Sequence, residues 1–385
     1  MNRRVFLATA AGGFTAAAQQ ADLPEPIRKL RPMLDGVVPI GDAERAARRE
    51  KARRLMAENK LDALYLESGT SMYYFTGKRT AGEAAILGAK SKAETVWTTP
   101  DPAKAAQALR DMGIATGKVG MEEQVRFATF DGLRRELPAV ECVSGTPVSA
   151  GCRVIKSAAE IALLQRANEI TIEAYKAALA SLREGMTQRD LSANIAAAFR
   201  ALGVSGNAMA IFGKYTAFPH GSIQPQELRE GDMVLIDDGC TVEGYVSDIT
   251  RTTVFGKPTK RQREIWDLER RAQDAALAAA KPGVTCESVD AAARKVITDA
   301  GFGPGYKTPG LPHRTGHGIG LDGHEWTYLV KGNKTKLEPG MCFSDEPTIV
   351  IYGEFGVRLE DCMYITPAGA RMFTKQSPAI DQPFG

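Results

Sequence analysis

Several features that mark large classes of protein are absent from this chain of 385 residues. No run of 18 or more uncharged apolar residues is present, so we expect no membrane span in the mature protein. There is no basic run, and the net charge is only +3, so we expect neither a nucleic-acid nor an anionic-membrane partner. The N-terminal part has no glycine-rich phosphate loop, and the cysteines form no CxxC pair, which disfavours a zinc–cysteine site.

Cysteine is also sparse, with six residues scattered along the chain: Cys142, Cys152, Cys240, Cys286, Cys342 and Cys362. This scatter is not typical of a disulfide framework, and small buried apolar side chains are the commoner interpretation. An exported protein can still oxidise some of its thiols. Cys342 and Cys362 lie on adjacent predicted strands, so a bridge between them stays open.

The N-terminus has the pattern of an export signal. Arg3 and Arg4 precede Val5, Phe6 and Leu7, and a weakly apolar stretch of small residues follows before a polar tail. This resembles a bacterial twin-arginine signal, which exports proteins already folded. We therefore assign residues 1–22 as a signal peptide and expect a periplasmic or extracellular protein.

The length favours two domains, because 385 residues are too many for one core. Residues 23–152 alternate short strands with helices and predict a small α/β domain, in which Met72–Gly77 is expected to be an aromatic strand end. The character changes near Cys152, and residues 153–385 predict an α+β domain. No catalytic constellation is visible in the first domain, whose work we expect to be packing, oligomerisation or shaping a cleft.

An internal repeat organises the second domain. A long helix from Ala158 to Leu182 is followed by a break and a second helix that Thr187 caps. Arg261–Ala280 repeats the long helix, and Thr285 repeats the cap before a helix that runs to Gly301. A strand hairpin follows each helix pair. This order predicts a pseudo-twofold duplication that brings the two hairpins together.

Each hairpin carries two acids at pairing positions. Asp237 and Asp248 are equidistant from a turn centred near Val242–Glu243, so we expect them to face each other across the strands. Glu346 and Glu360 are equidistant from Gly353 in the same way. Opposed carboxylates on apolar strands are destabilising unless one is protonated or a cation lies between them, so the four acids predict a metal site.

The four histidines of the chain bracket these hairpins: His220, His313, His317 and His324. Three of them fall within twelve residues, in a glycine-rich segment that allows close backbone approach. The fourth lies just before the first hairpin. Because none occurs in the N-terminal domain, they favour a site, but the zinc-protease motif HExxH is absent since residue 328 is tyrosine.

These motifs resemble the pita-bread metallopeptidases, which comprise aminopeptidase P, prolidase and methionine aminopeptidase. The matching segments are Asp-x-Gly followed by Gly-Tyr-x-Ser-Asp-x-Thr-Arg, then His-Arg-x-Gly-His-Gly-x-Gly, Glu-Pro, and Gly-Val-Arg-Leu-Glu-Asp. The resemblance covers about residues 153–366, and the first domain resembles the creatinase-type N-terminal domain. It implies a pita-bread catalytic domain and cleavage of Xaa-Pro peptide bonds, as an Xaa-Pro dipeptidase or aminopeptidase.

The resemblance also implies roles for individual residues. Asp237 binds one metal ion, Asp248 and Glu360 bridge both, and His317 and Glu346 bind the second. Glu346 is also a candidate proton shuttle. The other residues around the substrate are expected to be His220, His313 and His324, with Arg358 organising the site.

The cofactor expected from these donors is a pair of divalent ions. Mostly oxygen ligands favour Mn(II), with Co(II) and Zn(II) as alternatives. Paired ions can share a hydroxide at neutral pH and polarise a carbonyl group. The expected substrate is a short proline-containing peptide, and we expect a homodimer.

Two departures from the family pattern affect the substrate pocket. Thr348 and Val350 stand in the Glu-Pro segment where the family has Gly and Tyr. After His324-Glu325 comes Trp326-Thr-Tyr-Leu, where a proline is common. Rival interpretations are a metal-free peptide-binding module on the same fold and a side activity on a non-peptide bond such as an organophosphate. The sequence does not separate a dipeptidase from an aminopeptidase, because that depends on capture of the proline carboxylate.

Overall fold

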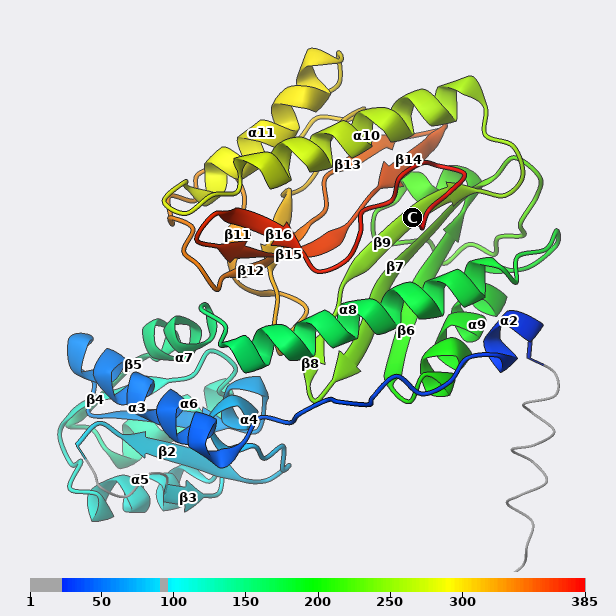
Figure 1. Ribbon diagram of the computed structural model, residues 1–385. Coiled ribbons are helices and arrows are strands. Elements are labelled where there is room, and N and C mark those ends of the chain that lie inside the picture. The colour runs from blue at the N-terminus through cyan, green and yellow to red at the C-terminus, as the bar shows by residue number, and fades with distance from the viewer. Residues whose placement is uncertain (1–22, 91–95, 385) are drawn as a thin grey trace, which may run out of the picture.

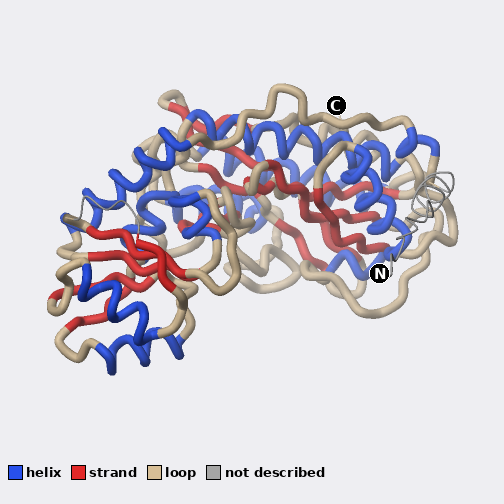
Figure 2. The backbone as a smooth tube through the Cα atoms, turned by 90° about the horizontal axis from the view of Figure 1, so that it is seen from below, coloured by secondary structure: helices blue, strands red, loops and turns tan. Residues whose placement is uncertain are grey.

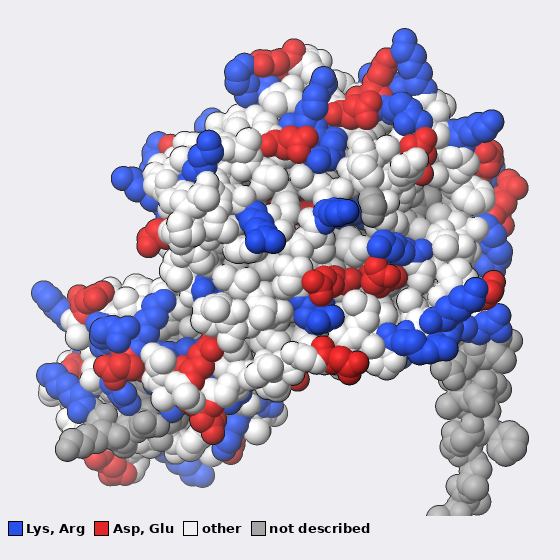
Figure 3. All heavy atoms as spheres, viewed as in Figure 1, with Lys and Arg blue, Asp and Glu red and all other residues white. Residues whose placement is uncertain are grey.

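The computed structural model describes residues 23–90 and 96–384, so the predicted signal peptide lies outside the described residues. Figure 1 shows a small α/β unit at one end of the molecule and a larger α+β unit built on long helices. In the described ranges, no helix combines the length and apolar character needed to cross a membrane. On the face shown in Figure 3, acidic and basic side chains are interspersed without a broad area of one sign.

The small unit is a five-stranded sheet with the order β3-β2-β1-β4-β5, in which β1, β4 and β5 are parallel. Its elements in chain order are α3 (Asp42–Glu58), β1 (Ala63–Glu67), α4 (Thr70–Thr76), β2 (Ala84–Gly88), β3 (Val96–Thr98), α5 (Pro102–Asp111), β4 (Gly117–Met121), α6 (Phe127–Glu136), β5 (Val140–Ser144) and α7 (Thr146–Arg153). Leu64 and Tyr65 of β1 are both fully buried and belong to different apolar clusters. Helices therefore cover both faces of the sheet, as Figure 2 shows.

The prediction of a strand at Met72–Gly77 is wrong, because this segment forms helix α4. Gly69 precedes the helix, and Gly77 ends it in a left-handed conformation with φ of 75°. Met72, Tyr74 and Phe75 are buried. Aromatic residues favour strands only weakly, and here tertiary packing overrides that preference.

The larger unit contains two helix pairs and several sheets. Its elements are α2 (Glu25–Arg28), α8 (Ala158–Leu179), α9 (Gln188–Ala201), β6 (Ser205–Phe212), the 3₁₀ helix η1 (Gly213–Ala217), β7 (Met233–Val242), β8 (Tyr245–Val246), β9 (Ile249–Val254), α10 (Lys260–Ala279), α11 (Cys286–Asp299), β10 (Gly316–Gly318), β11 (Glu325–Leu329), β12 (Cys342–Asp345), β13 (Thr348–Ile351), β14 (Phe355–Arg358), β15 (Asp361–Thr366) and β16 (Gly369–Met372). The short helix α2 contacts α8 and α9. In Figure 1, α8 crosses β6 and β7 while α10 lies beside β13 and β14.

The predicted helix repeat matches these elements. Thr187 caps α9 by accepting a hydrogen bond from the backbone N–H of Asp190, whose carboxylate in turn accepts from the Thr187 backbone. Such a cap stabilises a helix by about 1 kcal/mol. Thr285 occupies the same position before α11, although its side chain makes no capping hydrogen bond. The helix order therefore follows from caps and periodicity that the sequence displays.

Buried polar contacts join the two units. Arg48 of α3 donates to the hydroxyl of Tyr245 at 2.9 Å, and that hydroxyl donates to Glu160 at 2.8 Å. Thr70 of α4 donates to Asp322 at 2.5 Å. Asp322 lies in the loop between His317 and His324, so the small unit contacts the segment that carries two of the predicted site residues.

Candidate metal centre

The first acidic hairpin is formed by β7, β8 and β9. Glu243 and Gly244 both have positive φ, 50° and 89°, and make a two-residue turn that pairs Val242 with Tyr245. This register places Asp237 opposite Thr250. The predicted pairing of Asp237 with Asp248 is therefore wrong by two residues.

Asp248 nevertheless lies on the same face, because residues 248 and 250 differ by one full strand period. Ligand oxygens of Asp237, Asp248 and Glu360 all lie within 4.8 Å of one another. A Cβ atom at Gly239 would collide with the backbone oxygen of Ser247. Glycine at this position lets the strands approach closely enough to bring the two aspartates together.

The second acidic hairpin has the predicted register. Asp345 pairs with Asp361, and Thr348 pairs with Arg358. Both pairs share the register that places Glu346 opposite Glu360, at the break between the two short ladders. The prediction that these two glutamates face each other is therefore confirmed.

Thr250 joins the two hairpins. Its backbone N–H donates to the carbonyl of Glu360, and the N–H of Glu360 donates back, both at 3.2 Å. The hydroxyl oxygen of Thr250 lies 2.5 Å from Asp237 Oδ1 and 2.7 Å from Glu360 Oε2. A hydroxyl has only one proton to donate, so Thr250 can donate to only one of these two carboxylate oxygens at a time.

His317 presents one ring nitrogen to the acids. Its Nδ1 lies 3.0 Å from the carbonyl of Gly318 and must donate there, which leaves the lone pair on Nε2. Nε2 lies 3.6 Å from Asp248, 3.3 Å from Glu346 and 3.9 Å from Glu360. Burial lowers the pKa of His317 to about 3, so the ring is neutral and can act as a ligand.

Burial and mutual repulsion oppose ionisation of the acids in this site. Burial raises the pKa of Asp248 and Glu360 well above the ordinary range, and repulsion among the acids adds to the shift. Burial likewise raises the pKa of Glu346 to about 7. Oε1 of Glu360 is buried and has no hydrogen-bond partner. Four carboxylates, one of which has a buried oxygen without a hydrogen-bond partner, and one neutral imidazole form a set of ligands suited to divalent cations.

A cavity of about 140 Å³ collects the predicted site residues. Its lining consists of His220, Asp237, Asp248, His313, Arg314, His317, His324, Glu346, Arg358 and Glu360. All nine residues proposed from the sequence are therefore brought together. Their roles as ligands or catalytic groups remain predictions.

His313, His324 and Arg358 differ in which of their polar atoms are already engaged in hydrogen bonds or ion pairs. The Nδ1 of His313 lies 2.6 Å from the Arg314 carbonyl and its Nε2 lies 3.0 Å from the Thr348 hydroxyl, so both of its ring nitrogens are engaged. His324 accepts from Arg314 at Nδ1, at 3.0 Å, which places its own proton on Nε2. Arg358 forms an ion pair with Asp237 and donates to Thr250 and to the carbonyl of Pro219. His313 is thus suited to positioning, and His324 to donating a hydrogen bond.

Arg314 is the residue that sequence reasoning missed. It lines the cavity, it forms no ion pair with an acid in the described ranges, and its buried Nε has no hydrogen-bond partner. Its guanidinium also lies 5.2 Å from the centre of the Tyr328 ring. The sequence placed Arg314 between two histidines of a motif, but nothing there indicated that its guanidinium lies in the cavity without an ion pair to any of the described acids.

A second set of buried acids lies behind the ligand-bearing strands. Asp345, Asp361 and Glu269 of α10 are fully buried, and among the residues that the structure describes only Asp361 of these three acids has an ion pair, with Arg251 at 2.7 Å. Burial, followed by repulsion from Asp345, raises the pKa of Glu269 well above the ordinary range. Glu269 is therefore protonated in the folded protein at pH values where it is ionised in the unfolded chain.

This arrangement predicts a pH-dependent stability that Glu269→Gln changes. An acid whose pKa is higher in the folded protein than in the unfolded chain contributes stability that is fully present below the unfolded pKa. That contribution is lost as pH rises toward the folded pKa, because the unfolded chain releases its proton first. Removing the group should reduce the pH slope of the free energy of unfolding above pH 5 by up to about 1.4 kcal/mol per pH unit. Urea denaturation at several pH values measures the slope, with Glu264→Gln, an exposed acid on the same helix, as control. Equal slopes in the two variants would contradict the assignment.

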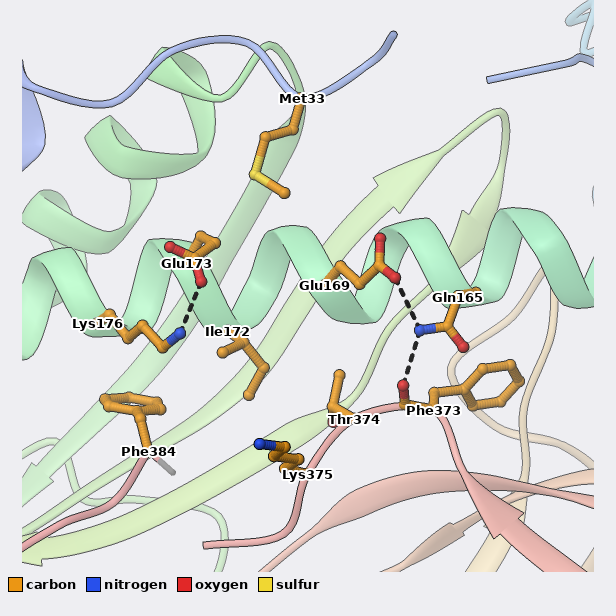
Figure 4. Close-up of a pocket in the computed structure, with 10 residues that line it drawn as sticks. All are labelled: Met33, Gln165, Glu169, Ile172, Glu173, Lys176, Phe373, Thr374, Lys375 and Phe384. Carbon is orange, nitrogen blue, oxygen red and sulfur yellow. Dashed lines mark hydrogen bonds and ion pairs between the residues drawn. The ribbon is translucent and has the colours of Figure 1, made fainter. Parts of the chain in front are cut away.

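A larger cavity, about 580 Å³, lies on the outer side of α8 (Figure 4). The residues that line it are Met33, Gln165, Glu169, Ile172, Glu173, Lys176, Phe373, Thr374, Lys375 and Phe384. Its polar groups mostly pair with one another: Gln165 donates to Glu169 at 3.0 Å, and Lys176 pairs with Glu173 at 2.7 Å. It shares no residue with the cavity of the acids and histidines, so size alone does not identify the functional site.

Comparison with known proteins agrees with this geometry. Residues 162–367 match metallopeptidase family M24, and residues 48–107 match the creatinase/prolidase N-terminal domain. An Xaa-Pro dipeptidase of Lactobacillus delbrueckii subsp. lactis is 34% identical over 363 residues, covering 86% of this chain and 97% of the relative.

Solved structures give the same result. The dipeptidase of Pyrococcus horikoshii OT3 superposes with a TM-score of 0.78 at 29% identity, covering 85% of this chain and 98% of that one. An X-Pro aminopeptidase of Thermotoga maritima superposes with a TM-score of 0.77 at 25% identity, covering 86% and 98%. The predicted pita-bread fold with a creatinase-type N-terminal domain is confirmed, and the chain belongs to metallopeptidase family M24.

Proposed function

We propose that this metallopeptidase hydrolyses Xaa-Pro dipeptides with two divalent ions held side by side. The observation that carries the proposal is that two groups of three candidate metal ligands share one residue. Asp237, Asp248 and Glu360 form one group, and His317, Glu346 and Glu360 form the other. Each group offers three ligand atoms within 4.8 Å of one another, so each group would hold one ion, with Glu360 common to both groups.

The ligand assignment follows from these groups. Asp237 would hold one ion, His317 and Glu346 the other, and Asp248 would join Glu360 as a bridge. Oxygen-rich coordination supports Mn(II) as the metal, with Co(II) and Zn(II) as alternatives. When bound, such ions lower the pKa of a water molecule and polarise the carbonyl of the peptide bond.

The side chains around the ions would handle protons and charge. Glu346 is placed to accept the proton of the attacking water at its carboxylate, because it borders the cavity and is only slightly exposed. The Nε2–H of His324 would donate to the oxyanion that develops on the scissile carbonyl, and His220 is a second candidate donor. Arg358 would hold Asp237 in its ligand orientation.

Arg314 supports a dipeptide substrate. Its guanidinium forms no ion pair with an acid among the described residues and contacts the proposed oxyanion donor, so it can bind a carboxylate with two parallel hydrogen bonds. In a dipeptide the proline carboxylate is close to the scissile bond, whereas a longer peptide places an amide there. The named relatives include Xaa-Pro dipeptidases, which agrees with this choice.

Substrate comparison tests the proposal. The purified protein, stripped with a chelator and reloaded with Mn(II), is expected to hydrolyse Ala-Pro, to hydrolyse Ala-Pro-Ala poorly, and to lose activity on stripping. Faster cleavage of Ala-Pro-Ala would make it an aminopeptidase. Absence of bound metal together with absence of cleavage of either peptide would instead favour the metal-free binding module. Export through the twin-arginine route and a homodimeric assembly remain further predictions.

A further inference from the structure

A second cavity adjoins the metal centre at the boundary between the two units. It has a volume of about 460 Å³. Glu123 and Gln124 of the small unit line one side, and Trp326 and Tyr328 of the larger unit line another. His324 lines both this cavity and that of the metal centre. A substrate group that extends past His324 would therefore enter this space.

The connection between the cavities is close. The ring of His324 lies 4.0 Å from that of His317, measured between centroids. Arg314 contacts His324 on one side and the face of Tyr328 on the other. The imidazole of His324, the proposed oxyanion donor, therefore forms the wall between the cavity of the metal centre and the second cavity.

The second cavity has unbalanced negative charge. Glu123 is exposed and forms no ion pair with a basic side chain in the described part of the chain. Arg153 also lines the cavity, but its charge is shared between Asp322 at 2.6 Å and Glu325 at 2.5 Å.

An aromatic side chain provides a second attraction for a cation. Trp326 lines the cavity and keeps 45% of its surface exposed, whereas the face of the Tyr328 ring is already covered by Arg314. The negative face of the Trp326 ring attracts a cation placed over it. Glu123 and the Trp326 ring together favour an ammonium or guanidinium group over an anion or a plain aliphatic chain.

We propose that this cavity receives a basic side chain, lysine or arginine, on the substrate residue that precedes proline. The inference rests on the proposed function. A dipeptide has few groups that can reach the cavity. Its α-amine lies two bonds from the scissile carbonyl and stays in the metal cavity, its carboxylate is repelled by Glu123, and its proline ring is apolar. Only a long side chain of the first residue can extend past His324 and carry a positive charge.

The ratio of kcat/KM for Arg-Pro to that for Leu-Pro tests the inference in the Mn(II)-loaded protein. We expect a ratio of about 10 for the wild type, and this preference should arise from a lower KM for Arg-Pro. It should weaken as salt is added, because the cavity is open to solvent. Glu123→Gln should reduce the ratio to about 1, and Glu123→Lys should lower it further while favouring Glu-Pro. Glu136→Gln, an exposed acid of the same unit, should keep the wild-type ratio.

The outcomes separate the two proposals. Cleavage of Leu-Pro and Arg-Pro with equal kcat/KM would overturn the subsite and leave the peptidase proposal in place. A preference for Arg-Pro that Glu123→Gln does not change would also overturn it. Failure to cleave any Xaa-Pro dipeptide would refute the proposed function itself.

Discussion

Asp248→Asn is expected to reduce kcat on Ala-Pro by about 10³-fold or more and to lower the bound metal from two equivalents to about one. Among the described residues, three groups of side chains could hold a metal ion, and Asp248 belongs to two of them: one with Asp237 and Glu360, and one with His317 and His324. Asparagine has nearly the same shape but no charge, and its single carbonyl oxygen is a weak bridging ligand. Metal content by elemental analysis and steady-state kinetics measure the two effects.

The same substitution should stabilise the metal-free protein. Without ions, burial and repulsion raise the pKa of Asp248, so the wild type loses stability as pH rises above the ordinary carboxyl range. Removing the group removes that loss. Chelator-treated Asp248→Asn should therefore have a higher Tm at pH 8 than the chelator-treated wild type, and its Tm should rise less on addition of Mn(II).

Asp238→Asn is the matched control. Asp238 adjoins the ligand-bearing position, is exposed, and belongs to none of the donor groups found in the described residues. Asparagine has nearly the same size and shape as aspartate, so the backbone strain at the positive φ of 133° is similar in the variant and in the wild type. The control should keep two equivalents of metal and activity within a few-fold of the wild type. If Asp248→Asn behaved in the same way, the bridging assignment would be wrong.

The sequence predicted the helical repeat and the second hairpin well, because both depend on local chemistry. Threonine caps and apolar periodicity are visible in single segments, and the register around Gly353 follows from symmetry about one glycine-rich turn. The prediction of the first hairpin was wrong in one detail, the register of its strands. Glu243, not a glycine, adopts positive φ in the turn, and this moves the centre by one residue and the register by two.

The convergence of the acids was predicted for a reason that survives this error. A shift of two residues keeps every side chain on its own face of the sheet, so Asp237 and Asp248 stay neighbours on a diagonal. A shift of one residue would have separated them. The site was therefore predictable from the alternation of strand residues together with the family motifs, even where the exact pairing was not.

The fold of the small unit was predictable from its sequence, but its contribution to the cavity beside the metal centre was not. Glu123 follows a strand like many solvated acids, and its place beside Trp326 depends on how the two units dock. That docking uses long-range contacts such as Thr70 with Asp322, separated by 252 residues. The unpaired charge of Arg314 is likewise a property of the assembled cavity, since it depends on which acids are already occupied.

Arg314→Gln is expected to reduce the ratio of kcat/KM for Ala-Pro to that for Ala-Pro-amide by about 10²-fold. The amide has the same ring and scissile bond but no carboxylate, so the ratio isolates recognition of that group. Losing a charge-assisted, two-pronged contact in a partly buried cavity costs about 2–3 kcal/mol, which corresponds to this change. The effect should fall on KM more than on kcat.

Two further variants decide how Arg314 acts. Arg314→Lys retains the charge but lacks the planar fork, so it should recover only part of the ratio. Arg371→Gln, an exposed arginine on β16, should leave the ratio at the wild-type value. If Arg314→Gln lowered kcat equally on both substrates, Arg314 would act only through its hydrogen bond to His324 Nδ1. That hydrogen bond fixes the tautomer of the imidazole, which affects every substrate alike. A selective loss on Ala-Pro would instead make Arg314 the group that restricts this chain to dipeptides.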